Sequence, residues 1–285
     1  MAADSAEFFD PASAALAGLP LLIFGFWILR ATLPRIGRVL LERGAPAASI
    51  FWTATEIAFA ACVILLGMEL SFFGLRQLAM ESVLDSLLAT DFGLLLGCVA
   101  AYAGGVLATQ RQRPGLSRSD ALSLTASGMG LAPGVCGARL LKLAVYGGFG
   151  VFLAVPVILG VMSVNPYLLE LIGYEFATQD VLVSLISMSG VGLVGGLMLA
   201  TFVGPILEEV LFRGFVQPLA VQGLGPLAGV VLTSLLFGLI HGTAAFLPVF
   251  TLSLVLGILR QNSGHLLPAI VAHCLWNAGT MALSL

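Results

Sequence analysis

The chain has 285 residues, of which 59% are hydrophobic and 9% are charged, and its mean hydropathy is +1.06. Soluble globular domains carry about 25% charged residues, so this composition excludes a water-soluble protein. It indicates an all-α integral membrane protein whose main partner is the lipid bilayer. The net charge is −3, and no basic array indicates a nucleic-acid partner.

Apolar runs long enough to cross a bilayer core, about 20 residues, recur along the whole chain. Pro, Gly and charged residues end these runs. They predict a polytopic bundle of about eight transmembrane helices over residues 12–29, 47–68, 87–108, 143–163, 181–203 (continuing through the charged stretch that follows), 226–243, 244–259 and 266–284. Between the sixth and seventh helices there is only the Gly242–Thr243 region and Pro248, so one of the two is expected to be short, broken or re-entrant.

Basic residues gather on one side of the predicted spans. If the spans alternate in direction, ten of the twelve basic residues fall on that side: Arg30, Arg35, Arg38, Arg43, Arg111, Arg113, Arg118, Arg139, Lys142 and Arg260. The positive-inside rule makes this side the cytoplasm and places both termini outside. The first 17 residues lack the basic start of a cleaved signal peptide. We therefore expect a retained first helix and a multi-pass protein of the cell membrane.

The chain divides at a polar connection. Residues 1–142 are predicted to hold the N-terminal transmembrane helices and a cytoplasmic connection, in which a short interfacial helix begins near Asp120, capped by Ser117 or Ser119. In this part Glu56 is an intramembrane carboxylate without a partner in its own helix. The four cysteines, Cys62, Cys98, Cys136 and Cys274, are isolated, with no disulfide or zinc-binding spacing. The residues that suggest chemistry lie in 143–285.

The stretch GPILEEVLFRGF, residues 204–215, places three charges in an apolar helix. Between residues 181 and 259, Glu208, Glu209 and Arg213 are the only acidic or basic residues of the types Asp, Glu, Lys and Arg. Glu209 and Arg213 are four apart and share a helix face, which predicts an ion pair. Glu208 points about 100° away and is free to face a polar cavity. A helix-stabilising cluster of all three is the alternative.

Two histidines follow on later predicted helices. His241 comes four residues after Phe237, and His273 comes four residues before Asn277, on the same helix face. A rise of 1.5 Å per residue allows Glu208, His241 and His273 to reach one zone of the membrane. Breaks expected at Gly214 and Pro218 shorten the path from the cytoplasmic side to Glu208. His265 follows Gly264 at the predicted cytoplasmic edge, where we expect it to be solvated.

These side chains predict a hydrolytic site in one of two forms. Glu208, His241 and His273 could ligate a zinc ion that acidifies a bound water. Without a metal, Glu208 and His241 could polarise the water as general base, while His273 and Asn277 hold the developing oxyanion. No HExxH motif is present, so the geometry must come from separate helices.

At these residues the chain resembles the CAAX protease and bacteriocin-processing family of intramembrane proteases, which includes CAAX prenyl protease 2. The family pattern EExxxR, FxxxH and HxxxN reads here as EEVLFR from Glu208, FGLIH from Phe237 and HCLWN from His273, within residues 195–285. The resemblance implies an eight-helix bundle with a catalytic cavity open to the cytoplasm. It implies Glu208 and His241 as water activators, His273 and Asn277 as further catalytic groups, and Glu209–Arg213 as a supporting pair. It leaves the zinc and the glutamate-driven mechanisms open.

Three functions are compatible with this pattern. The first is an endopeptidase that cleaves a peptide or membrane-protein substrate, whose identity and prenylation the sequence leaves open. The second is a proton-coupled transporter that uses the buried Glu and His groups as a relay. The third is a non-catalytic scaffold or immunity factor with the same fold.

Overall fold

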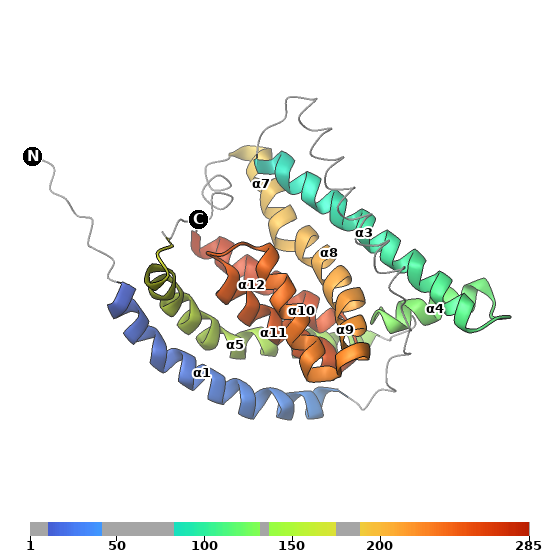
Figure 1. The fold of residues 1–285 in the computed structure, drawn as a ribbon, viewed down its shortest axis with the longest axis horizontal. Helices are drawn as coiled ribbons and strands as arrows, with labels where there is room; N and C mark the ends of the chain where they lie inside the picture. The colour runs from blue at the N-terminus through green and yellow to red at the C-terminus, as the bar shows by residue number, and fades with distance from the viewer. Residues whose placement is uncertain (1–10, 42–82, 132–136, 175–188, 285) are drawn as a thin grey trace, which may run out of the picture.

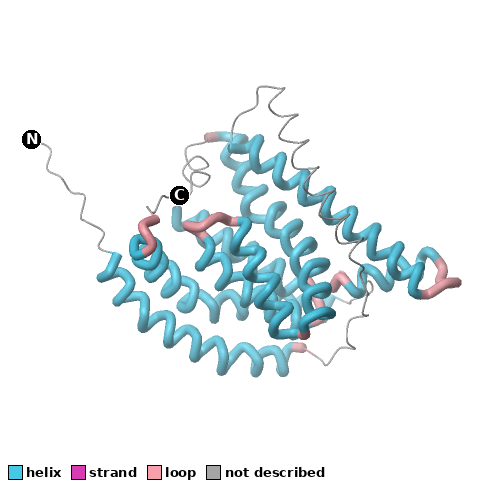
Figure 2. The backbone as a smooth tube through the Cα atoms, viewed as in Figure 1, coloured by secondary structure: helices cyan, strands magenta, loops and turns pink. Residues whose placement is uncertain are grey.

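A computed structural model describes residues 11–41, 83–131, 137–174 and 189–284 of the chain. The predicted second span, residues 47–68 with Glu56, lies outside the described residues, and so does the start of the fifth span. The described part is helical apart from short turns and loops and contains no strand (Figure 2). The all-α prediction is therefore confirmed for the described ranges.

Five described stretches are long and apolar enough to cross a membrane: Ala14–Arg38, Leu84–Gln112, Gly137–Leu171, Gly190–Leu224 and Phe246–Ser263. Large apolar side chains on them point outward, including Trp27 at 66% exposure and Phe152 at 71%. Such exposure would be costly in water, and it indicates a surface that faces lipid. The protein is thus a multi-pass membrane protein.

Helix α1 (Pro11–Leu40) is longer than predicted, because it continues through Arg30, Arg35 and Arg38. Arginine ends an apolar run but is a good helix former, so the apolar boundary is not the helix boundary. The helix lies along α5 (Gly137–Leu171) in Figure 1. A Cβ added to Gly25 would lie 2.5 Å from the main-chain nitrogen of Val157. Glycine therefore permits this close approach.

Helix α3 (Val83–Gln112) leads through a short turn to α4 (Arg118–Gly128). The Ser117 hydroxyl accepts a hydrogen bond of 3.1 Å from the main-chain N–H of Asp120, which confirms one of the two predicted caps. The hydroxyls of Thr109 and Thr125 are 3.2 Å apart and join α3 to α4. The polar connection is thus an ordered helix held against a transmembrane helix.

Helix α10 (Pro226–Ile240) is short, as expected, at 15 residues. It ends in a turn at His241–Ala245, in which Gly242 has a φ of +82°. Helix α11 (Phe246–Ser263) then runs back, and α12 (Leu267–Ser284) closes the described chain. The side-chain amide of Asn165, from α5, donates a 2.8 Å hydrogen bond to the carbonyl of Ala244 and holds the turn.

The fifth predicted span continues without a break through the charged motif to Leu224. It consists of α7 (Gly190–Met198), the π-helical η1 (Leu199–Val203), α8 (Gly204–Leu211), the π-helical η2 (Phe212–Val216) and α9 (Gln217–Leu224). The expected breaks at Gly214 and Pro218 were wrong. Each π-helical segment ends two residues before a proline, in FVGP and FVQP. The widened turn accommodates a residue that has no N–H and would clash in a regular helix.

Two clusters of buried apolar side chains flank the motif. One lies among α1, α5, α11 and α12 and includes Leu33, Tyr146, Ala154, Ile158, Leu256, Leu259 and Ala272. The other lies among α3, α8, η2 and α10 and includes Leu94, Cys98, Ala101, Leu211, Phe215 and Phe237. The candidate site lies between them, where α8, the end of α10 and α12 meet.

Candidate active site

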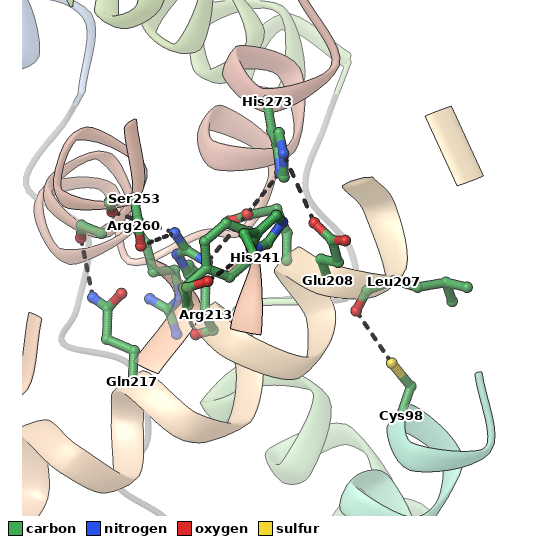
Figure 3. Close-up of polar contacts among 12 residues, drawn as sticks. Cys98, Leu207, Glu208, Arg213, Gln217, His241, Ser253, Arg260 and His273 are labelled. Carbon is green, nitrogen blue, oxygen red and sulfur yellow. Dashed lines mark hydrogen bonds and ion pairs between the residues drawn. The ribbon is translucent and has the colours of Figure 1, made fainter. Parts of the chain in front are cut away.

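His273 of α12 contacts the two neighbouring glutamates of α8, and Figure 3 shows it beside Glu208. Its Nδ1 is 3.0 Å from Oε1 of Glu209, and its Nε2 is 3.8 Å from Oε2 of Glu208. Because a carboxylate oxygen accepts, the Nδ1 atom donates, and this hydrogen bond fixes the orientation of the ring. The His273 side chain is 5% exposed and that of Glu208 is 21% exposed. Glu208 is therefore the more accessible carboxylate.

Glu209 and Arg213 form the ion pair that their spacing predicts. Nη1 of Arg213 is 3.3 Å from Oε1 of Glu209, and both side chains are fully buried. The Nη2 atom donates to the hydroxyl of Ser253 at 2.8 Å and to its carbonyl at 3.3 Å. Opposite charge and these polar contacts stabilise the guanidinium in a buried place. Glu209 has a second role that the sequence did not predict, the contact with His273.

The ring of Phe237 connects the three motifs. The Arg213 guanidinium lies over it at 4.6 Å from the ring centre. The ring centre is also 4.6 Å from that of His241 and 5.8 Å from that of His273. Phe237 is fully buried, so it fixes the distance between the two histidine rings from one side.

His241 is the first residue of the turn after α10. Its Nδ1 lies 2.7 Å from the carbonyl oxygen of Phe237. A carbonyl only accepts, so Nδ1 carries the hydrogen in this contact, and a neutral ring then has its lone pair on Nε2. The residue is partly exposed. It therefore offers one nitrogen as a base, and Asn165 of α5 holds the turn that carries it.

Asn277 lies one helical turn after His273 and donates its side-chain amide to the carbonyl of Ala200 at 2.9 Å. This carbonyl is free for a local reason. In the π-helical segment, the N–H of Gly204 donates to the carbonyl of Leu199 and not to that of Ala200. The next residue, Pro205, has no N–H to donate. Pro205 thus leaves an acceptor that anchors Asn277.

The second π-helical segment repeats the same arrangement. The N–H of Gln217 donates to the carbonyl of Phe212, and Pro218 has no N–H. Neither residue can therefore donate to the carbonyl of Arg213, which has no donor within its own helix. It accepts from Nε of Arg260 at 3.2 Å. The Nη2 atom of the same arginine donates to the carbonyl of Gly128 at 3.2 Å. Arg260 thus ties the end of α4 to the charged motif.

His265 differs from the expectation of a solvated histidine. It is partly buried, and its Nδ1 accepts a 3.1 Å hydrogen bond from the main-chain N–H of Leu267, in the first turn of α12. Burial, and next the positive charges of Arg260 and Arg139, lower the pKa of His265. A neutral ring keeps the Nδ1 acceptor that the helix start needs.

The predicted zinc ligands do not form a ligand set. In the described ranges, no group of three or more His, Cys, Asp and Glu side chains is arranged to hold a metal ion. The described positions of Glu208, His241 and His273 thus do not fit a three-ligand zinc site. The zinc ligands stay a prediction.

Sequence reasoning missed Asp91 on α3. The residue is 9% exposed and lies within the span Leu84–Gln112. Its Oδ1 is 3.2 Å from the place that a Cβ of Gly204 would occupy, one turn before Glu208 on α8. The signal was present in the sequence, because an acidic residue inside an apolar span is costly and usually functional.

Comparison with known proteins adds one finding. Residues 190–279 match the family model of type II CAAX prenyl endopeptidase Rce1-like proteins. These residues belong to the CAAX protease family. The matched range holds the three motifs and most of the helices that bring them together, which supports a CAAX-type intramembrane endopeptidase. Searches of curated proteins and of solved structures found no match.

Proposed function

We propose that this CAAX-type protein is an intramembrane endopeptidase in which Glu208 activates water for the hydrolysis of a peptide bond. The observation that carries the proposal is the place of His273. Its ring is held by Glu209 on one side and turns Nε2 toward Glu208, at 3.8 Å, on the other. This separation is short enough for one water molecule to contact both side chains.

Each candidate residue has a separate part in this proposal. Glu208 takes a proton from water as the water oxygen attacks the carbonyl carbon, and His241 assists through its free Nε2. Asn277, and His273 with a hydrogen on Nε2 as well as on Nδ1, stabilise the negative charge that develops on the carbonyl oxygen. The leaving nitrogen takes up the proton when the C–N bond breaks. Glu209 and Arg213 hold His273 and stay outside the reaction.

The site is proposed to open to the cytoplasmic side of the cell membrane. The basic residues toward the ends of α1 and α3 and at the start of α5 support this orientation through the positive-inside rule. The substrate is then a peptide or a membrane-protein segment that enters from the cytoplasm or from the lipid. The family description suggests a prenylated peptide as the first probe.

Cleavage of a defined peptide by the reconstituted protein tests this proposal. The probe is a quenched fluorescent peptide that ends in a farnesylated CAAX sequence, with the same peptide lacking the farnesyl group beside it. We expect cleavage by the parent and none by Glu208→Ala or His241→Ala, while all three proteins remain folded in the membrane. The matched histidine control, His265→Ala, should retain cleavage. Equal cleavage by the parent and Glu208→Ala would end the proposal.

A further inference from the structure

Asp91 is a buried carboxylate that the proposed reaction does not yet use. It lies in α3, in the stretch ATDFG, inside a span that crosses the membrane. Its Oδ2 atom is fully buried and has no hydrogen-bond partner among the described residues. Unsatisfied buried polar atoms are rare in folded proteins, and each needs an explanation.

The position of Asp91 relates it to Glu208. Its Oδ1 lies against Gly204, and Gly204 and Glu208 are four residues apart on α8 and so share one face. The same helix contact continues at Cys98, whose sulfur donates to the carbonyl of Leu207 at 3.4 Å (Figure 3). α3 therefore presents Asp91 to the side of α8 that carries the proposed base.

Packing does not explain this residue. A carboxylate oxygen that is buried without a partner lowers the stability of the folded protein, and an apolar side chain in its place would not. Residues that reduce stability in this way are typical of functional sites. A small polar ligand next to Glu208 would satisfy the free oxygen.

We propose that Asp91 is a second water-binding carboxylate of the site, a role that rests on the proposed function. A water molecule in this place donates one hydrogen toward the bases Glu208 and His241 and the other to Asp91. Glu208 takes the first proton as the water oxygen attacks, and the second hydrogen stays on that oxygen, where Asp91 accepts its hydrogen bond and fixes the direction of attack. The products are a carboxylic acid and an amine, and Asp91 neither gains nor loses a proton.

Substitutions at position 91 test this role against a packing role. We compare Asp91→Leu, which removes the acceptor, and Asp91→Asn, which retains one side-chain oxygen, with the parent on the same farnesylated peptide. We expect Asp91→Leu to lower kcat by about tenfold or more and Asp91→Asn to lower it less. KM should stay within about twofold, and Tm should be equal to or above that of the parent. The control is Cys98→Ala at the same helix contact, which should retain kcat.

The outcomes separate the two proposals. An active parent with full kcat in Asp91→Leu would overturn the role of Asp91 alone. A fall in Tm together with equal falls in kcat for Asp91→Leu and Asp91→Asn would also overturn it, because it would show a packing role. Should Asp91→Leu fail to fold, a fully active Asp91→Asn with an unchanged KM would contradict the proposal. If the parent shows no cleavage that depends on Glu208, both the proposed function and the role of Asp91 are overturned.

Discussion

Nδ1 of His273 lies 3.0 Å from Oε1 of Glu209, and both side chains are buried. The second glutamate of the EExxxR motif therefore does more than pair with Arg213, because it also orients the histidine that faces Glu208. One buried carboxylate thus connects the ion pair of α8 to the candidate site on α12.

Arg213→Ala should prevent stable folding more than it affects chemistry. It would leave the Glu209 carboxylate buried without its cation, and removal of one member of a buried pair costs about 3–5 kcal/mol. Thermal unfolding in detergent and the yield of monodisperse protein measure this effect. Ser253→Ala, which removes only a hydroxyl partner of the same guanidinium, is the milder control. A normal yield and Tm for Arg213→Ala would contradict the role of the pair.

Pro205→Ala should misplace Asn277. Alanine restores an N–H at position 205 that competes for the free carbonyls of η1, including the Ala200 carbonyl that Asn277 binds. We expect kcat on the farnesylated peptide to fall by about tenfold while the protein stays folded, since alanine favours the helix. Pro218→Ala is the matched change after η2, in α9 and away from Asn277, and should affect kcat much less. Unchanged kcat in Pro205→Ala would show that the freed carbonyl has no role in the reaction.

His265 should make the stability of the protein depend on pH. Its pKa is lowered in the folded state by burial and by Arg260 and Arg139, so the unfolded chain binds the proton more tightly. The contribution of His265 to the free energy of unfolding is therefore fully present above the ordinary histidine pKa, about 6.5. It decreases as the pH falls through that value. We expect a lower Tm at pH 5.5 than at pH 7.5, and a smaller difference in His265→Gln. An equal difference in both proteins would assign the effect to another group.

Cleavage should withstand a strong zinc chelator, because the described residues do not form a three-ligand site. The measurement is kcat before and after dialysis of the reconstituted protein against the chelator. A loss of activity that one equivalent of zinc restores would contradict this expectation. It would support the alternative in which Glu208, His241 and His273 come together around a metal ion.

The sequence predicted those parts of the molecule that depend on local spacing. The Glu209–Arg213 pair follows from a spacing of four residues on one helix, and the Ser117 cap follows from its place just before a helix start. Patterns of hydropathy placed the described spans to within several residues. They failed at the end of α1, because arginine stops an apolar run without stopping a helix.

Contacts between helices could not be predicted in the same way. The bond between Glu209 and His273 depends on how α8 and α12 rotate and slide against each other, which no local pattern encodes. The π-helical turns depend on how the chain relieves a proline inside a long helix, so Pro218 was read as a break. Asp91 was missed for a different reason. Its place inside an apolar span can be read from the sequence, but its contact with Gly204 of α8 cannot.

The most direct test compares Glu208→Gln with Glu209→Gln, two neighbouring changes of the same size, on the same peptide. We expect Glu208→Gln to fold like the parent and its kcat, per folded molecule, to fall by about 100-fold or more. Glu209→Gln should instead give less folded protein, because it leaves Arg213 buried without its anion. A Glu208→Gln protein that cleaves the peptide at the parent's rate would contradict the central claim.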